Sequence, residues 1–315
     1  MLNEGRNCLQ VLISTSTFNL KNFVGLDDLK NAKIDVKLNP HGKRLTRDQV
    51  LELLDEKTVG LIAGLEQLSA EVLKPAKSLK VIARVGTGLD SVDLVAAKEL
   101  GIQVLNTPDA PTSAVAELTL AHILGILRNV GSTDRQIRLG NWQGQMGSLL
   151  ATKTVGVVGF GRIGRQVAKL LSSFGSKVVV CETNLKVTDF EVCSLDDLCR
   201  RADVLTLHLP YDESTHHLIG EKQIRMMKPG SFVVNVARGG LIDEAALLKA
   251  LETGHLAGVA LDCFEVEPYS GPLSKLDNVQ MTAHMGTYAR ETRDLMEQEA
   301  SRLLMDCLRK LAIVK

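Results

Sequence analysis

The chain has 315 residues, a length typical of about two domains, and 45% of them are hydrophobic, enough to form buried cores. Its 37 basic and 37 acidic residues give a formal net charge of zero, which argues against a nucleic-acid-binding surface. Aromatic residues make up only 3%, which disfavours stacking platforms for bases or sugars, and no apolar run reaches the ~18 residues of a membrane span.

Apolar, β-branched runs alternate with helical patterns through the first 105 residues. The expected strands are residues 9–14, 33–38, 59–63, 79–84 and 102–106, and the expected helices are 26–32, 46–54, 69–73 and 92–100. Thr46 stands where it could cap the second of these helices. Such alternation is typical of a parallel sheet with crossover helices, so this part of the chain predicts an α/β domain of its own.

The proline-containing segment 106–111 (NTPDAP) breaks this alternation and is interpreted as a crossover or a hinge. A helix is expected next, over residues 113–129, and it is apolar on almost every side although Glu117, His122 and Gly125 interrupt it. A helix that is apolar all round is expected to be buried between domains or between subunits. We therefore predict a homodimer that forms through the 113–129 region.

The segment 154–164, TVGVVGFGRIG, starts a second α/β series. Its Gly159, Gly161 and Gly164 form a G-x-G-x-x-G pattern between an apolar strand and a helix. The first glycine allows a tight turn, the second lets the backbone approach a pyrophosphate, and the third lets helix and strand pack closely. Because the helix N-terminus then faces the anion, we expect a dinucleotide-binding domain of the Rossmann type.

Glu182 follows Gly164 by 18 residues and ends the strand-like run VVVCE. A carboxylate at this position accepts hydrogen bonds from the ribose hydroxyls of adenosine and repels a 2′-phosphate. Thr183 and Asn184 supply no arginine for such a phosphate, and Lys186 is less well placed. The predicted cofactor is therefore NAD rather than NADP.

Six strands are expected in the second series, followed by one long amphipathic helix over residues 289–311. The strands are residues 154–159, 177–181, 204–207, 232–235, 258–261 and 279–281. Because the final helix has no place in this sheet, we expect it to pack on the first domain. The predicted fold class is α/β with two doubly wound parallel-sheet domains: a Rossmann NAD-binding domain (107–284) inserted into a discontinuous, flavodoxin-like substrate-binding domain (1–106 and 285–315).

The six cysteines form no C-x-x-C pair, and none has a histidine at a zinc-like spacing. We therefore expect reduced thiols and no metal site. The N-terminus lacks the layout of a signal peptide, because Glu4 precedes the short run VLIS. These features predict a cytoplasmic protein with no nucleic-acid or membrane partner.

Three segments of the second half place a charged or titratable residue just past an apolar strand: SFVVNVARGGLID at 231–243, LDCFEVEP at 261–268 and TAHMGT at 282–287. Together with RVGTGLDSVDLVAA, NTPDAPTSAVAELTL, VGFGRIGR and HLPYDESTHHLI, they make the chain resemble the D-isomer-specific 2-hydroxyacid dehydrogenases, especially the phosphoglycerate dehydrogenase branch. The resemblance covers about residues 55–300. It implies hydride transfer between NAD and a D-2-hydroxy acid, in a cleft between two domains.

The resemblance also implies the roles of individual residues. Arg238 would hold the substrate carboxylate and polarise the 2-keto oxygen, His284 would take or give the hydroxyl proton, and Glu267 would orient the imidazole and favour its protonated form. The further residues that it assigns to the substrate are Arg84, Val85 and Gly86. Those that it assigns to the cofactor are Thr87, Arg162, Ile163, Leu209, Val236, Ala237, Asp262 and Gly286.

The identity of the acid is the open part of this prediction. Gly64 stands where many phosphoglycerate dehydrogenases have an arginine for the substrate phosphate, and Glu66 would tend to repel that phosphate. Arg84 is retained, and the partner subunit's Arg135 or Arg138 could add a contact. D-3-phosphoglycerate, oxidised to 3-phosphohydroxypyruvate in the first step of serine biosynthesis, is the leading prediction, with glyoxylate or hydroxypyruvate reduction as the alternative. A different class, an NADH-sensing corepressor-like binding protein, would tolerate loss of the catalytic trio that this chain keeps.

Overall fold

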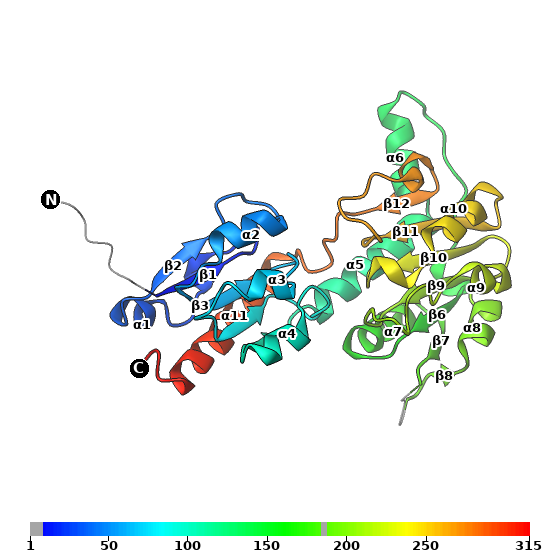
Figure 1. Cartoon of the computed structure of the whole chain (residues 1–315). Helices are drawn as coiled ribbons and strands as arrows, with labels where there is room; N and C mark the ends of the chain where they lie inside the picture. The colour runs from blue at the N-terminus through cyan, green and yellow to red at the C-terminus, as the bar shows by residue number, and fades with distance from the viewer. Residues whose placement is uncertain (1–8, 184–187) are drawn as a thin grey trace. The chain divides into compact units, whose positions relative to one another are not determined.

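The computed structural model describes residues 9–183 and 188–315, which form two compact units (Figure 1). One unit comprises Met1–Pro111 and Ala289–Lys315, and the other comprises Thr112–Tyr288. The chain thus passes between the units five and four residues later than the boundaries predicted at 106 and 284. The segment after 106 stays with the first unit because the Thr107 amide donates to the Gly86 carbonyl (3.1 Å) and its hydroxyl accepts from the Gly86 amide (2.9 Å).

The first unit contains a five-stranded parallel sheet in the order β2-β1-β3-β4-β5. Its strands are β1 (Gln10–Ile13), β2 (Asp35–Leu38), β3 (Thr58–Ala63), β4 (Val81–Arg84) and β5 (Gln103–Asn106). This is the flavodoxin-like order, so the fold expected for this part is confirmed. Ligand sites in such sheets lie beyond the carboxyl ends of the strands, which directs attention to the loops after β3 and β4.

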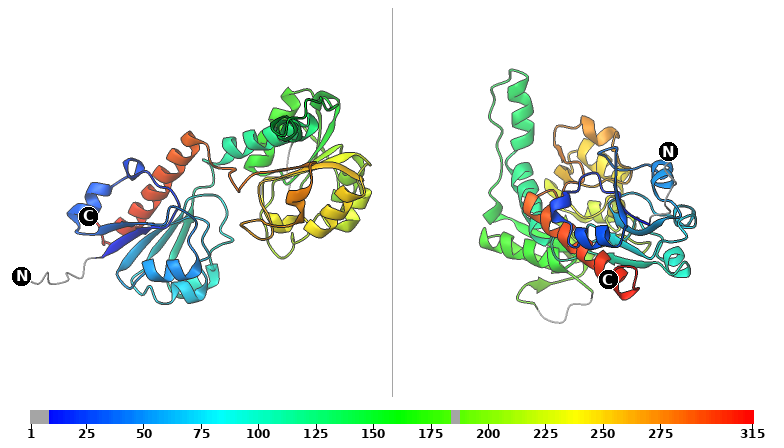
Figure 2. Two further views of the ribbon diagram at one scale, coloured as in Figure 1. Left: turned by 90° about the horizontal axis from the view of Figure 1, so that it is seen from above. Right: turned by 90° about the vertical axis from the view of Figure 1, so that its left-hand side faces the viewer.

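Helices cover both faces of this sheet, as the left view of Figure 2 shows. They are α1 (Leu26–Asn31), α2 (Arg47–Leu53), α3 (Ala70–Leu73), α4 (Leu94–Glu99), α11 (Arg290–Lys310) and the 3-10 turn η1 (Leu20–Asn22). Successive residues of β3 point to opposite faces: Ile62 packs in the core beneath α11, and Leu61 packs with α2, α3 and α4. Thr46 caps α2 as predicted, in a reciprocal capping box with Gln49.

The second unit contains a seven-stranded parallel sheet in the order β12-β11-β10-β9-β6-β7-β8. Its strands are β6 (Thr154–Val158), β7 (Lys177–Cys181), β8 (Glu191–Val192), β9 (Val204–Leu207), β10 (Ser231–Asn235), β11 (Leu256–Leu261) and β12 (Val279–Met281). This is the Rossmann order with one strand added at the β11 edge. The prediction of six strands was wrong, because the two-residue β8 is exposed and carries no apolar pattern.

Helices lie on both faces of this sheet as well. They are α5 (Thr112–Leu127), α6 (Val130–Arg138), α7 (Arg162–Ser173), α8 (Leu195–Arg201), α9 (Glu221–Met226) and α10 (Glu244–Glu252), with 3-10 turns η2 (Leu150–Thr152), η3 (Gly239–Leu241) and η4 (Pro272–Lys275). Val157 packs with α5 and α7, whereas Val158 packs in the core on the opposite face, with Leu198 of α8.

The helix predicted over 113–129 corresponds to α5, which ends two residues earlier than predicted, whereas the separate helix α6 was not predicted. Asn129 adopts a left-handed conformation (φ 55°), so α5 ends before it and α6 starts after it at an angle of 64°. The apolar sides of α5 are buried within its own unit, because the helix packs there against α7, β10, β11 and β12. Within the described residues no single helix is long and apolar enough to cross a membrane, although α5 and α6 pass that test when taken as one bent pair.

Candidate active site

The turn after β6 has the geometry that a pyrophosphate needs. Gly159 has a φ of 88°, and a Cβ there would lie 2.5 Å from the carbonyl oxygen of His208. A Cβ on Gly164 would collide with the carbonyl oxygen of Gly159, so only glycine lets the helix start this close to the strand. A Cβ on Gly161, the N-cap of α7, would meet no atom within 4 Å, so backbone there borders open space. Arg162 and Ile163 begin the helix whose positive end faces that space.

Glu182 reaches the same turn from the end of β7. Its Oε2 accepts a hydrogen bond from the Phe160 amide (2.9 Å), and its Oε1 accepts one from the Thr183 amide (2.8 Å). These bonds orient the Glu182 carboxylate at the turn. Leu209 also lies at the turn, with Cδ2 2.7 Å from where a Gly159 Cβ would stand. The residues around the turn therefore fit NAD. Asn184 and Lys186 lie outside the described residues.

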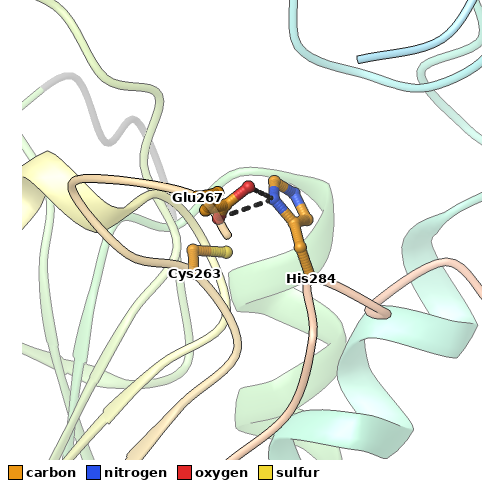
Figure 3. A group of neighbouring side chains, drawn as sticks. All are labelled: Cys263, Glu267 and His284. Carbon is orange, nitrogen blue, oxygen red and sulfur yellow. Dashed lines mark hydrogen bonds and ion pairs between the residues drawn. The ribbon is translucent and has the colours of Figure 1, made fainter. Parts of the chain in front are cut away.

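Glu267 and His284 form a carboxylate–imidazole pair. Nδ1 of His284 lies 3.0 Å from each carboxylate oxygen of Glu267, and the two side chains are 20% and 24% exposed (Figure 3). The Phe264 amide also donates to Glu267 Oε1 (3.2 Å), which fixes the carboxylate. With Nδ1–H directed at Glu267, the Nε2 lone pair remains to accept a proton from a substrate. The pair therefore has the geometry of an oriented general base.

Asp262, the first residue after β11, holds the loop that carries His284. Its side chain is fully buried. Its backbone carbonyl accepts from the His284 amide (2.8 Å), while its carboxylate accepts from the amides of Met285 and Gly286, each at 2.8 Å. These bonds hold His284 at a φ of 50°, a left-handed conformation that a non-glycine residue rarely adopts. Asp262 was predicted to contact nicotinamide; the structure gives its carboxylate these loop amides as partners.

Arg238, at the start of the turn η3, lies close to the same loops. Its Nη1 donates to the Ala237 carbonyl (2.8 Å), and the Cys263 thiol donates to that carbonyl as well (3.3 Å). The backbone here is fixed by Asn235, whose side-chain amide donates to the Arg238 carbonyl (2.6 Å) and accepts from the Ala237 amide (3.0 Å). A Cβ on Gly286 would lie 3.5 Å from Cγ1 of Val236, so Val236 lies beside the His284 loop.

Comparison with known proteins identifies the family. The family model described as "D-isomer specific 2-hydroxyacid dehydrogenase, NAD binding domain" matches residues 120–286. The chain belongs to this family. It is an NAD-dependent oxidoreductase of the D-2-hydroxyacid dehydrogenases, and both the resemblance drawn from the motifs and the prediction of NAD are confirmed.

Three relatives show the range of this dehydrogenase family. A D-3-phosphoglycerate dehydrogenase of Methanocaldococcus jannaschii is 40% identical over 258 residues, which are 79% of this chain but only 49% of that protein. A hydroxypyruvate reductase of Thermotoga maritima is 37% identical over 265 residues, 82% of this chain and 87% of that protein. A solved structure of a Thermus thermophilus protein superposes with a TM-score of 0.87 at 37% identity and covers 96% of this chain and 97% of that one.

Sequence reasoning missed a buried hydrogen-bond chain behind the dehydrogenase's His284 loop. The Gln280 side-chain amide donates to Nδ1 of His122 (2.8 Å), Nε2 of His122 lies 3.0 Å from the Thr282 hydroxyl, and that hydroxyl donates to Asp262 (2.5 Å). Burial lowers the pKa of His122, although the Asp262 charge partly offsets this. The one signal in the sequence was a histidine in the middle of an otherwise apolar helix.

The loops predicted to bind the substrate belong to the first unit of the dehydrogenase. Arg84 is buried, and its guanidinium donates to the carbonyl of Val85. Gly86 is joined to Thr107, and the Thr87 carbonyl accepts from the Asn106 side chain (2.7 Å). The loop is therefore fixed in shape by side chains from both of its ends.

Glu66 differs from its prediction. It was expected to present a charge that repels phosphate, but it is only 1% exposed. Its carboxylate accepts from the Ser14 hydroxyl and from the Gly64 amide, the latter at 2.9 Å. A buried carboxylate with hydrogen-bond donors around it is satisfied within its own unit. Gly64 brings no cation to this loop.

The other histidines near the site also have definite partners. Burial lowers the pKa of His208 to about 3, and its Nε2 lies 3.0 Å from the Thr206 hydroxyl. His217 is partly buried and lies 2.8 Å from Oε1 of Glu265. His216 is exposed and stacks on His217.

Proposed function

We propose that the chain catalyses reversible hydride transfer between a D-2-hydroxy acid and NAD with His284 as the residue that moves the hydroxyl proton. The observation that carries this proposal is the His284–Glu267 pair, with both carboxylate oxygens 3.0 Å from Nδ1. NAD, when bound, supplies the nicotinamide that accepts or returns the hydride. His284 takes the hydroxyl proton at Nε2 as the hydride leaves C2, and Glu267 stabilises the imidazolium that forms.

Arg238 is the proposed electrophilic partner in this reaction. Its planar guanidinium can bind a carboxylate and stabilise negative charge that develops on the 2-oxygen. The loop of Arg84, Val85 and Gly86 is proposed to bind the substrate carboxylate through backbone amides and charge. Residues proposed to bind NAD are Thr87, Gly159, Gly161, Arg162, Ile163, Gly164, Glu182, Leu209, Val236, Ala237 and Gly286; Asp262 is proposed to act mainly by holding the His284 loop.

The proposed substrate is D-3-phosphoglycerate, which would place the enzyme in serine biosynthesis. Support comes from the motifs of the phosphoglycerate dehydrogenase branch and from the 40% identity to the relative of that name. A second candidate, hydroxypyruvate or glyoxylate reduction, is favoured by Gly64, which stands where many phosphoglycerate dehydrogenases have an arginine and whose backbone amide is bonded to Glu66. Nothing in that loop attracts a phosphate.

The two substrate classes are separated by steady-state kinetics. D-3-phosphoglycerate, D-glycerate and D-lactate are compared by the rate of NADH formation, with the L-enantiomers as controls and NADP in place of NAD in a parallel series. The primary proposal expects the highest kcat/KM for D-3-phosphoglycerate with NAD. A higher kcat/KM for D-glycerate would establish the second candidate, and absence of turnover with every D-acid would refute the enzymatic proposal itself.

We also propose that the enzyme is a cytoplasmic homodimer. Support for the dimer comes from large apolar side chains in and after α6, of which Trp142 is 90% and Met146 96% exposed. The others are Val130, Ile137, Leu139 and Leu149. Monomers rarely expose so many large apolar groups in one stretch, so we propose that a second copy of the chain binds there and buries them. This shifts the proposed contact from the 113–129 helix toward its C-terminal flank.

A further inference from the structure

The His284–Glu267 pair has a third neighbour that the proposed reaction does not use. The buried thiol of Cys263 lies beside the pair, and one potential ligand atom from each of the three residues lies within 4.8 Å of the other two (Figure 3). Cys263 and Glu267 come from the loop after β11, and His284 comes from the loop after the adjacent β12. All three therefore belong to one compact unit, and their arrangement needs nothing from the other.

We propose that Cys263, Glu267 and His284 form a binding site for a thiophilic divalent cation of the Zn²⁺ class. Sulfur, imidazole nitrogen and carboxylate oxygen are the ligands that Zn²⁺ takes, at roughly 2.0–2.3 Å, and three protein ligands with one open position is a common arrangement. Tetrahedral ligand atoms at those distances lie about 3.5 Å apart, so a pair at the 4.8 Å limit needs to shorten by only about 1.3 Å. One thiolate and one carboxylate balance the two charges of the cation.

The cation replaces the thiol proton of Cys263, which passes to solvent. It also takes the Nδ1 lone pair of His284, so the imidazole proton now directed at Glu267 moves to Nε2 through solvent. Each cation bound therefore releases one proton, as expected for metal binding to a thiol. The fourth position remains for water or for an oxygen of the substrate.

The consequence for the enzyme rests on the proposed function. An imidazole with the cation on Nδ1 and hydrogen on Nε2 has no lone pair left to accept the hydroxyl proton. The cation also binds the Glu267 carboxylate that would otherwise stabilise the imidazolium. In addition, the two positive charges of the cation disfavour a further positive charge on the imidazole. The bound cation therefore stops oxidation of the hydroxy acid, and its removal restores the reaction. The site makes the dehydrogenase sensitive to zinc-class cations.

Direct binding tests the site without any catalytic assay. Cd²⁺ is titrated into the full chain, and the ultraviolet charge-transfer band of a Cd–thiolate bond is recorded for the wild type, Cys263→Val and Cys199→Val. Cys199 is the matched control, because it is a buried free thiol of the same unit with Cys181 and Cys193 nearby. Cys263→Ala repeats the test if the valine variant does not fold. The proposal expects the band in the wild type and in Cys199→Val, with its loss in either Cys263 variant.

Inhibition provides the second arm. Zn²⁺ is expected to inhibit NADH formation by the wild type and EDTA to reverse it, whereas Cys263→Val, measured against its own uninhibited rate, requires at least ~10-fold more Zn²⁺. A band that survives in both Cys263 variants, or an unchanged inhibition midpoint in Cys263→Val, would overturn the proposal. Absence of turnover without any metal would instead count against the proposed function, and the Cd²⁺ band would still decide the site.

Discussion

His284 adopts a left-handed backbone conformation at a cost of about 1–2 kcal/mol, and its neighbours show how that cost is met. Three backbone amides of its loop donate to Asp262, each at 2.8 Å, and the imidazole is fixed on Glu267. Because these bonds over-determine the loop, the strained conformation persists. The result is an imidazole whose orientation is set before any ligand binds.

Also at the residue scale, the lowered pKa of His208 leads us to predict that the free energy of unfolding changes with pH. Its pKa is about 3 in the folded protein because of burial, against 6.5 for an ordinary histidine. A histidine with a lowered folded pKa favours folding above about pH 6.5, and that contribution is lost as the pH falls toward 3. Between pH 6.5 and about pH 4 the loss is roughly 3 kcal/mol at most.

As the pH falls, the unfolding free energy of His208→Asn is therefore expected to decrease less than that of the wild type. Urea denaturation of the cofactor-free protein measures both. The exposed His216 supplies a control, since His216→Asn should leave the wild-type pH dependence in place. An identical acid dependence for wild type and His208→Asn would show that His208 is not the group responsible.

At the scale of elements, α5 and the His284 loop are joined through His122. Its buried imidazole bonds to Gln280 and lies 3.0 Å from the hydroxyl of Thr282, which in turn donates to Asp262. His122→Leu removes this connection, so the side chains of Gln280 and Thr282 lose their hydrogen-bond partner. We expect a loss of about 1–3 kcal/mol in unfolding free energy and a fall of about 10-fold or more in kcat, because the catalytic loop loosens.

The matched change is Ile123→Val on the same helix, which should cost about 1 kcal/mol in unfolding free energy and leave kcat as in the wild type. Denaturation and initial rates are measured on both variants. A His122→Leu enzyme with wild-type turnover would mean that the chain of hydrogen bonds serves the fold alone.

Much of this architecture could be predicted from the order of apolar runs, because parallel strands and their crossover helices each leave a local periodicity. β8 could not, since two exposed residues at a sheet edge carry no pattern. Helix α6 could not either, because none of its residues is buried, and a helix without a core-facing side leaves little apolar periodicity. The His122 connection joins residues about 160 positions apart, and no local pattern records such a pairing.

The trio of Arg238, Glu267 and His284 was inferred from family motifs rather than from spacing, and the structure brings Glu267 and His284 into contact. The burial of Glu66 could not be predicted from the sequence, because Ser14 becomes its partner only when β1 and β3 pair in the sheet. The same holds for Cys263, whose position beside the pair depends on the pairing of β11 with β12.

For the whole molecule, the exposed apolar groups after α6 predict the oligomeric state. Replacing both Trp142 and Met146 with serine should convert the dimer to a monomer at micromolar concentration, because the apolar area that drives association is removed. Light scattering gives the masses, and replacement of Tyr288, an exposed aromatic residue elsewhere in the same unit, by serine is the control. A monomeric wild type would contradict the dimer directly.

The account as a whole depends on His284 as the proton-transferring residue, and one comparison tests that most directly. kcat/KM for the best D-2-hydroxy acid is measured for wild type and His284→Ala, alongside NADH affinity by fluorescence, with His216→Ala as a histidine control. We predict a fall of at least ~10²-fold in kcat/KM for His284→Ala at unchanged NADH affinity, and wild-type values for His216→Ala. Wild-type kcat/KM in His284→Ala would contradict the account.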